Sequence, residues 1–130
     1  MGEYENALDD IKKTMGIVMD QFTSIPHDAL PHELAEMKKF ALGETKIPAK
    51  YRELMGLAVA SATHCPYCIH FHTRAARMNG ATDDEIAETA FLTRFTTGWS
   101  AILHAANIDF DKFKKQFAQV EEHLSKQTTH

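Results

Sequence analysis

Residues 63–72 read THCPYCIHFH and contain both cysteines of the chain and three of its eight histidines. Cys65 and Cys68 have the C-x-x-C spacing, which in a reducing compartment indicates redox or metal chemistry rather than a structural disulfide. If Pro66 lies in the first turn of a helix, the two Cα atoms are about 5 Å apart, within disulfide range. The N–H groups at the start of such a helix also stabilise a thiolate. The pair can therefore supply a nucleophile and close to a disulfide.

His72 and Glu53 are candidates for moving the thiol proton. Cys68 and His72 are separated by about 40° around a helix and about 6 Å along it, so the imidazole can accept a proton from Cys68 directly or through one water. The helix-end field favours Cys65 instead, and the spacing leaves open which sulfur attacks. A helical hairpin that turns at residues 64–65 brings Glu53 within about one helical turn of His72. Because Glu53 borders an apolar segment, its carboxylate needs a partner, and we expect that partner to be His72.

The rest of the chain predicts the helices that must position these residues. Apolar residues recur at helical spacing and alternating strand patterns are scarce. We expect an all-α helical bundle of five to six helices, forming one domain over residues 1–130. The expected helices cover residues 4–23, 31–42, 48–63, 66–79, a segment that begins with the capping box of Thr82, and a last helix capped by Asp109. The apolar segment 54–62 should lie at the centre of the bundle, and Trp99 and the phenylalanines of the last two helices should lie in the core.

The composition excludes several classes of protein. Apolar residues make up 44% of the chain, charged residues 25%, and the net charge is −4, which is typical of globular proteins and argues against nucleic-acid binding. The longest apolar segment is far shorter than the roughly 20 residues of a membrane span. The acidic N-terminus lacks a signal-peptide core, so we expect a cytoplasmic protein. The glycines form no nucleotide-binding loop, and we predict no bound flavin, nicotinamide or other cofactor.

A metal site is the main alternative for the cysteine segment. Cys65, Cys68 and His72 are suitable ligands, with His64 or Glu53 as a fourth. A structural zinc site commonly joins two such half-sites, and the sequence has no second Cys/His pair elsewhere. This argues against a structural zinc site and leaves an open catalytic or iron site as an alternative. We predict no metal ligands here, and a non-catalytic metal-binding protein is a further alternative. A pair of unreactive core cysteines is another.

The complete pattern from Glu53 to His72 is E-x11-C-x2-C-x3-H. It resembles the signature of the alkylhydroperoxidase D-like branch of the carboxymuconolactone decarboxylase family. The similarity extends over residues 52–88, where a small-residue helix precedes the cysteines and GATDDEIAE follows them. It covers a little over a quarter of the chain, near its centre.

The resemblance implies an all-helical alkylhydroperoxidase D-like fold assembled as a homo-oligomer, a trimer or a hexamer. It implies a peroxidase that takes electrons from a dithiol donor, such as a lipoylated or thioredoxin-like protein. Cys68 would attack the hydroperoxide and become a sulfenic acid, and Cys65 would convert it to a disulfide. His72 and Glu53 match the proton relay.

One position departs from the family pattern. The peroxidases of this branch carry a histidine immediately before the second cysteine, where this chain has Tyr67. A general thiol–disulfide oxidoreductase is therefore a variant of the redox hypothesis. A carboxymuconolactone-type decarboxylase, with His72 as base and Glu53 as its orienting group, is a further alternative. Decarboxylases of the family generally lack the C-x-x-C pair, which argues against it.

Overall fold

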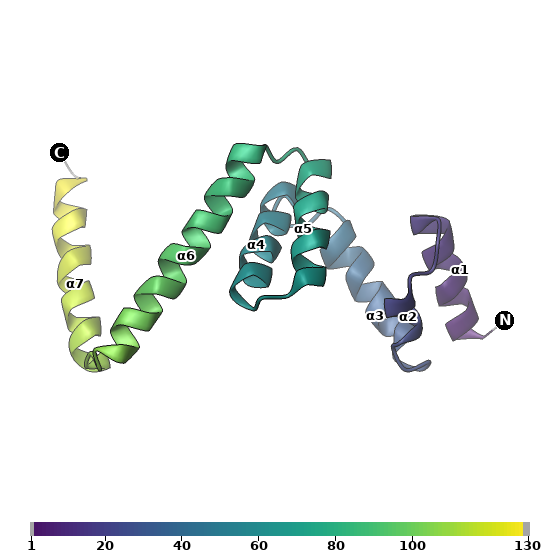
Figure 1. The fold of residues 1–130 in the computed structure, drawn as a ribbon, viewed down its shortest axis with the longest axis horizontal. Coiled ribbons are helices and arrows are strands. Elements are labelled where there is room, and N and C mark those ends of the chain that lie inside the picture. The colour runs from purple at the N-terminus through teal and green to yellow at the C-terminus, as the bar shows by residue number, and fades with distance from the viewer. Residues whose placement is uncertain (1, 129–130) are drawn as a thin grey trace.

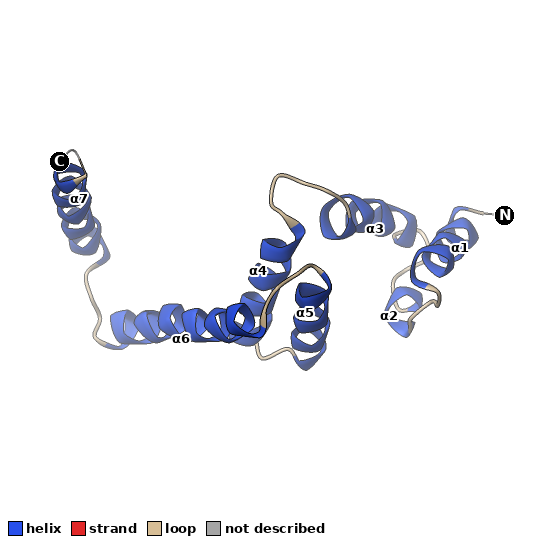
Figure 2. Ribbon diagram, turned by 90° about the horizontal axis from the view of Figure 1, so that it is seen from above, coloured by secondary structure: helices blue, strands red, loops and turns tan. Residues whose placement is uncertain are grey.

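The computed structural model describes residues 2–128, and within them it contains helices and connecting loops but no strand (Figures 1 and 2). The elements in chain order are α1 (Glu3–Met15), α2 (Asp20–Thr23), α3 (Leu30–Met37), the π-helix η1 (Lys38–Leu42), α4 (Ala49–Ala62), α5 (Pro66–Met78), α6 (Asp83–Ala105) and α7 (Phe110–Gln127). The all-α prediction is confirmed. Seven α-helices are present where five or six were expected. None of the helices described is long and apolar enough to cross a membrane.

The extra helix arises because the predicted helix over residues 4–23 is interrupted. Gly16 ends α1 with a left-handed φ of 86°, and its N–H donates to the carbonyl of Lys12 at 2.9 Å. The chain then turns back into the short helix α2. Ile11 of α1 and Phe22 of α2 nevertheless enter one buried cluster with Leu30. Two residues of the apolar pattern are thus buried together, although a turn rather than a continuous helix brings them there.

The helix expected over residues 31–42 is present in two parts. α3 begins with Pro31 in its first turn and continues directly into the π-helix η1. Gly43 follows in an extended conformation, with φ at −84°, and its carbonyl accepts a hydrogen bond from Nη1 of Arg52 at 2.9 Å. The segment before α4 is thereby attached to the helix that carries Glu53.

The three helices α4, α5 and α6 form the part of the fold that holds the predicted site, and α4 packs against both of the others. The predicted hairpin between α4 and α5 is present, with His64 at its turn in the left-handed region (φ 56°). The predicted capping box is also present, because Thr82 and Glu85 exchange two hydrogen bonds of 3.1 Å at the start of α6. Lys50 forms a 3.0 Å ion pair with Glu85, which joins the starts of α4 and α6.

The second half of α6 and all of α7 extend away from the rest of the chain, and the two helices form an open V (Figure 1). Neither α6 nor α7 contains a buried residue. The expectation of a closed bundle core is therefore wrong for this part: Trp99 is exposed, as is Phe110 at 69%. The segment 54–62, expected at the centre of the bundle, is buried on one face only: Leu57 and Ala60 are buried, whereas Val59 is 64% exposed. The exposed side chains recur at the helical spacing typical of core residues, but no described element of their own chain covers them.

Candidate functional site

The two cysteines lie at the N-terminus of α5. Cys65 is the residue that precedes the first helical turn, Pro66 begins the helix, and Cys68 follows in its first turn. The Cα atoms are 5.4 Å apart and the sulfurs are joined in a disulfide. The backbone N–H of Cys68 donates to Sγ of Cys65 at 3.2 Å. Cys68 is exposed and Cys65 is half-buried, so a reagent from solvent reaches Cys68 more easily.

Glu53 and His72 form the second half of the site, across the contact between α4 and α5. The Nδ1–H of His72 donates to Oε2 of Glu53, with the two atoms 2.7 Å apart. Glu53 is 5% exposed. Within residues 2–128 it is the only charged residue that is buried. The imidazole thus satisfies a carboxylate that would be costly to bury alone. Because Nδ1 is engaged, Nε2 is the nitrogen left to exchange a proton. The predicted contact between these two residues is present.

Gly56 is a contributor to the site that sequence reasoning missed. A Cβ atom at this position would lie 2.5 Å from both Cε1 and Nδ1 of His72. No side chain larger than hydrogen fits there while the ring stays in place. The sequence contains a signal for this role. Gly56 follows Glu53 by three residues and therefore lies on the same helix face. A glycine inside a helix also costs about 1 kcal/mol relative to alanine. An unexplained glycine in such a helix indicates a close approach.

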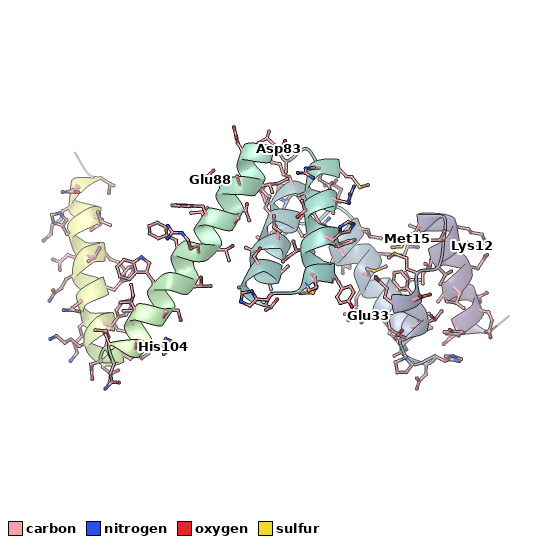
Figure 3. The ribbon with its side chains drawn as sticks, viewed as in Figure 1. Lys12, Met15, Glu33, Asp83, Glu88 and His104 are labelled. Atoms are coloured by element: carbon pink, nitrogen blue, oxygen red, sulfur yellow. A yellow bond between two sulfur atoms is a disulfide. The ribbon has the colours of Figure 1, made fainter. Side chains whose placement is uncertain are left out.

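The other aromatic residues of the segment are arranged around the site without entering the Glu53–His72 contact. Phe71 lies edge-on to the His72 ring, with centroids 5.0 Å apart. Tyr67 is 85% exposed, and His64 and His70 are also exposed. His104 lies at the end of α6 far from α5 (Figure 3).

The residues that were candidates for a metal site do not converge. Within residues 2–128, no three or more histidine, cysteine, aspartate or glutamate side chains are grouped so that they could hold a metal ion. Cys65 and Cys68 are bonded to each other, and Nδ1 of His72 is bonded to Glu53. What the arrangement offers is a dithiol pair at a helix end and an oriented imidazole one turn deeper in the same helix.

The all-helical fold, the Cys65–Cys68 pair and the Glu53–His72 pair together define a class: helical proteins with a paired-cysteine site. The carboxymuconolactone decarboxylase family model matches residues 28–109, and the chain belongs to this family. The match runs from just before α3 to the end of the loop after α6, so it includes both cysteines, Glu53 and His72. The family resemblance seen in the sequence is confirmed.

Two relatives show how far the similarity extends. The structure is similar to the crystal structure of the alkylhydroperoxidase AhpD core from Rhodospirillum rubrum, with a TM-score of 0.72 and 30% sequence identity, over 85% of this chain and 84% of that chain. The chain is also 30% identical, over 69 residues, to uncharacterized protein 4 in the cox locus of Paracoccus denitrificans. That match covers 53% of this chain and 62% of the relative. The alkylhydroperoxidase D-like fold is therefore shown.

Proposed function

We propose that the protein is a dithiol-dependent oxidoreductase of peroxidase type, in which Cys68 is the attacking thiol. The observation that carries this proposal is the Cys65–Cys68 disulfide at the start of α5, with His72 one turn beyond Cys68 and hydrogen-bonded to Glu53 of α4. A disulfide between residues this close in a helix can form and open without rearrangement of the backbone. The greater exposure of Cys68 supports its role as the sulfur that meets the substrate.

The oxidative half-reaction has two steps. The Cys68 thiolate attacks the distal oxygen of a hydroperoxide, the O–O bond breaks, and the products are a Cys68 sulfenic acid and an alkoxide that takes up a proton to become an alcohol. The Cys65 thiol then attacks the Cys68 sulfur, forms the disulfide and releases water. Two electrons have passed from the cysteine pair to the peroxide.

His72 handles protons in this sequence. Its Nε2 accepts the proton of the attacking thiol and returns a proton to the leaving alkoxide. Glu53 holds the ring by its Nδ1–H, and its negative charge stabilises the imidazolium that forms. The pair is thus a base together with the group that orients it, and the proton balance closes within one turnover.

The reductive half-reaction needs a partner. An external dithiol attacks the disulfide, forms a mixed disulfide and leaves as its own disulfide, which returns two thiols to the protein. A lipoylated or thioredoxin-like protein has this chemistry, and a cytoplasmic location would keep it reduced. We further propose that the protein works as a homo-oligomer, a trimer or hexamer.

Hydroperoxide consumption with a small dithiol as donor tests the proposal. Wild-type protein should turn over repeatedly, Cys68→Ser should lose turnover, and Cys65→Ser should accumulate a sulfenic acid that a dimedone-type reagent traps. Equal turnover in wild type and Cys68→Ser would end the assignment. Turnover of a disulfide substrate without peroxide consumption would instead identify a general thiol–disulfide oxidoreductase.

A decarboxylase is the second candidate, because the Glu53–His72 pair could act on a carbon acid without the cysteines. In that case the double variant Cys65→Ser/Cys68→Ser keeps activity on a carboxylated lactone, while His72→Ala loses it. The peroxidase proposal predicts the reverse dependence on the cysteines. One set of three proteins therefore separates the two functions.

A further inference from the structure

An apolar groove runs between α4 and α6. Its volume is about 470 Å³, and it is lined by two helical rows, among them Met55, Ala58 and Val59 of α4 and Leu92, Thr93 and Thr96 of α6. Along each helix the lining positions step by three and one in turn, so they follow one helix face as in a helix–helix seam. Alanine and threonine form much of its floor, so large side chains from another helix can enter between them. Met55, Val59 and Leu92 in the groove are exposed, so no helix of the described chain covers it.

Helix α7 has the shape and pattern of such a third helix. Its apolar side chains repeat at alternating three- and four-residue steps, at Phe110, Phe113, Phe117, Val120 and Leu124. All five are exposed in the chain by itself. Such a narrow row is the pattern of a helix that inserts knobs into the holes of a partner. In proteins most of the stability of a helix comes from packing of its amphipathic face, so α7 requires a surface to cover its apolar row.

The total exposed surface indicates how much covering is missing. A compact monomer of this mass exposes about 6,900 Å². This chain exposes 10221 Å². The excess is about 3,300 Å² per chain, or about 6,600 Å² for two chains, which is far above the roughly 1,600 Å² total of a standard interface and of the size that obligate oligomers bury. The surface left open is therefore of the size of a permanent interface, larger than a transient contact would cover.

We propose that α7 of one chain lies in the α4–α6 groove of a second copy. Its own groove is out of reach in this arrangement, because α7 is attached at the far end of α6 and diverges from it (Figures 1 and 2). A second copy is the occupant that fits both surfaces at once: every chain carries one groove with small residues and one row of phenylalanines, so a closed assembly covers all of them. This inference rests on the proposed self-association and is independent of the proposed chemistry.

Two matched pairs of substitutions test it by light scattering after size-exclusion chromatography. Phe113→Lys/Phe117→Lys places two charges in the row of α7, and Met55→Lys/Val59→Lys places two in the groove. Each should raise the dissociation constant at least about 100-fold, since buried aromatic and apolar anchors dominate interfaces. Ala118→Lys/Gln119→Lys adds the same charge to the other side of α7 and should stay oligomeric. Circular dichroism should show full helical content in the Ala118→Lys/Gln119→Lys control, and any loss in the other two variants should not exceed the contribution of α7.

A mixing experiment tests the contact between α7 of one copy and the α4–α6 groove of another. The α7 variant keeps an intact groove and the groove variant keeps an intact α7, so an equimolar mixture should form one-to-one pairs although neither variant associates alone. A monomeric wild type, an oligomeric α7 variant or groove variant, or a mixture that stays monomeric would each overturn the pairing of α7 with the groove. The assembly of Cys65→Ser/Cys68→Ser should match wild type. Failure of the peroxidase assay therefore leaves this result unaffected, and the reverse also holds.

Discussion

The imidazole of His72 lies directly on the backbone of Gly56, so that a Cβ at that glycine would be 2.5 Å from the ring. One turn earlier on the same helix, Glu53 accepts the hydrogen bond from Nδ1 of that ring at 2.7 Å. Helix α4 therefore supplies both an acceptor and an open space on one face. The position of the imidazole is fixed by the absence of a side chain as much as by the presence of a carboxylate.

We expect Gly56→Ala to lower peroxide turnover by about tenfold or more, because the methyl group must displace the ring and lengthen its hydrogen bond to Glu53. Alanine also favours the helix by about 1 kcal/mol, so loss of activity need not bring loss of helix. Steady-state turnover and circular dichroism measured on the same sample check both parts. Gly98→Ala in α6 is the matched control: no atom lies within 4 Å of its Cβ position, and activity should be unchanged. Unchanged turnover in Gly56→Ala would refute the positioning role.

Glu53→Gln should reduce turnover by at least about tenfold, because an amide keeps the size of the side chain but removes the charge that stabilises the imidazolium. Glu53→Ala should additionally destabilise the fold by about 1–3 kcal/mol, since it leaves the ring nitrogen of His72 without its partner. Turnover and urea denaturation measure the two effects. Glu88→Gln, the same change at an exposed position of α6, should alter neither. If Glu53→Gln were fully active, orientation of His72 by a charged group would be excluded.

Much of the site could be predicted because its parts are local or follow from one hairpin. The position of Cys65 at the helix entrance follows from Pro66, and the spacing within α5 places His72 one turn beyond Cys68. The contact with Glu53 needed one further assumption, an antiparallel turn at residues 64–65, and the buried charge made that assumption reasonable. The roles assigned to these residues remain predictions. Gly56 was not found, because its role depends on where the ring of a neighbouring helix lies.

The fold was predicted less evenly. Helix starts with a local cause, such as Thr82 and Asp109, were located to within a residue, since a capping side chain acts on the next turn. The interruption at Gly16 was missed because the apolar spacing continues across it. The burial of Trp99 was predicted wrongly for a related reason: periodicity shows that a helix face needs covering, but it does not say which chain covers it.

Gly16→Ala should destabilise the N-terminal helices by about 1 kcal/mol, because alanine is strained at the left-handed φ of 86° that Gly16 adopts. Gly16→Asn should cost less, since asparagine tolerates that conformation. Urea denaturation followed by circular dichroism measures the difference between the two variants. Equal stability of Gly16→Ala and wild type would show that the turn after α1 adopts another conformation in solution.

The ion pair that joins α4 to α6 predicts a loss of stability in acid. The backbone N–H of Thr82, and then the ammonium of Lys50, lower the pKa of the Glu85 carboxyl from its usual 4.5. A carboxyl whose pKa is lowered by folding stabilises the fold above its unfolded pKa, and this contribution disappears as the pH falls through the folded value. Glu85→Gln should therefore melt at lower temperature at neutral pH and lose less stability below about pH 4.5. Glu88→Gln should keep the pH dependence of wild type. If the melting temperature of Glu85→Gln fell between neutral pH and about pH 4.5 as much as that of wild type, this account would be contradicted.

Tyr67 offers a test of how far the chain has moved from the peroxidases that it resembles. Its side chain is 85% exposed between the two cysteines, so substitutions there should leave the fold intact. Tyr67→His restores the residue of the peroxidase pattern and adds a group that exchanges protons near pH 6.5, so we expect several-fold faster peroxide turnover with a new pH dependence in that region. Tyr67→Phe controls for the phenol and should match wild type. If Tyr67→Phe were slower, the hydroxyl would take part in proton transfer. If Tyr67→His brought no gain, the dithiol exchange step would limit turnover, and single-turnover oxidation of the reduced protein would then separate the two half-reactions.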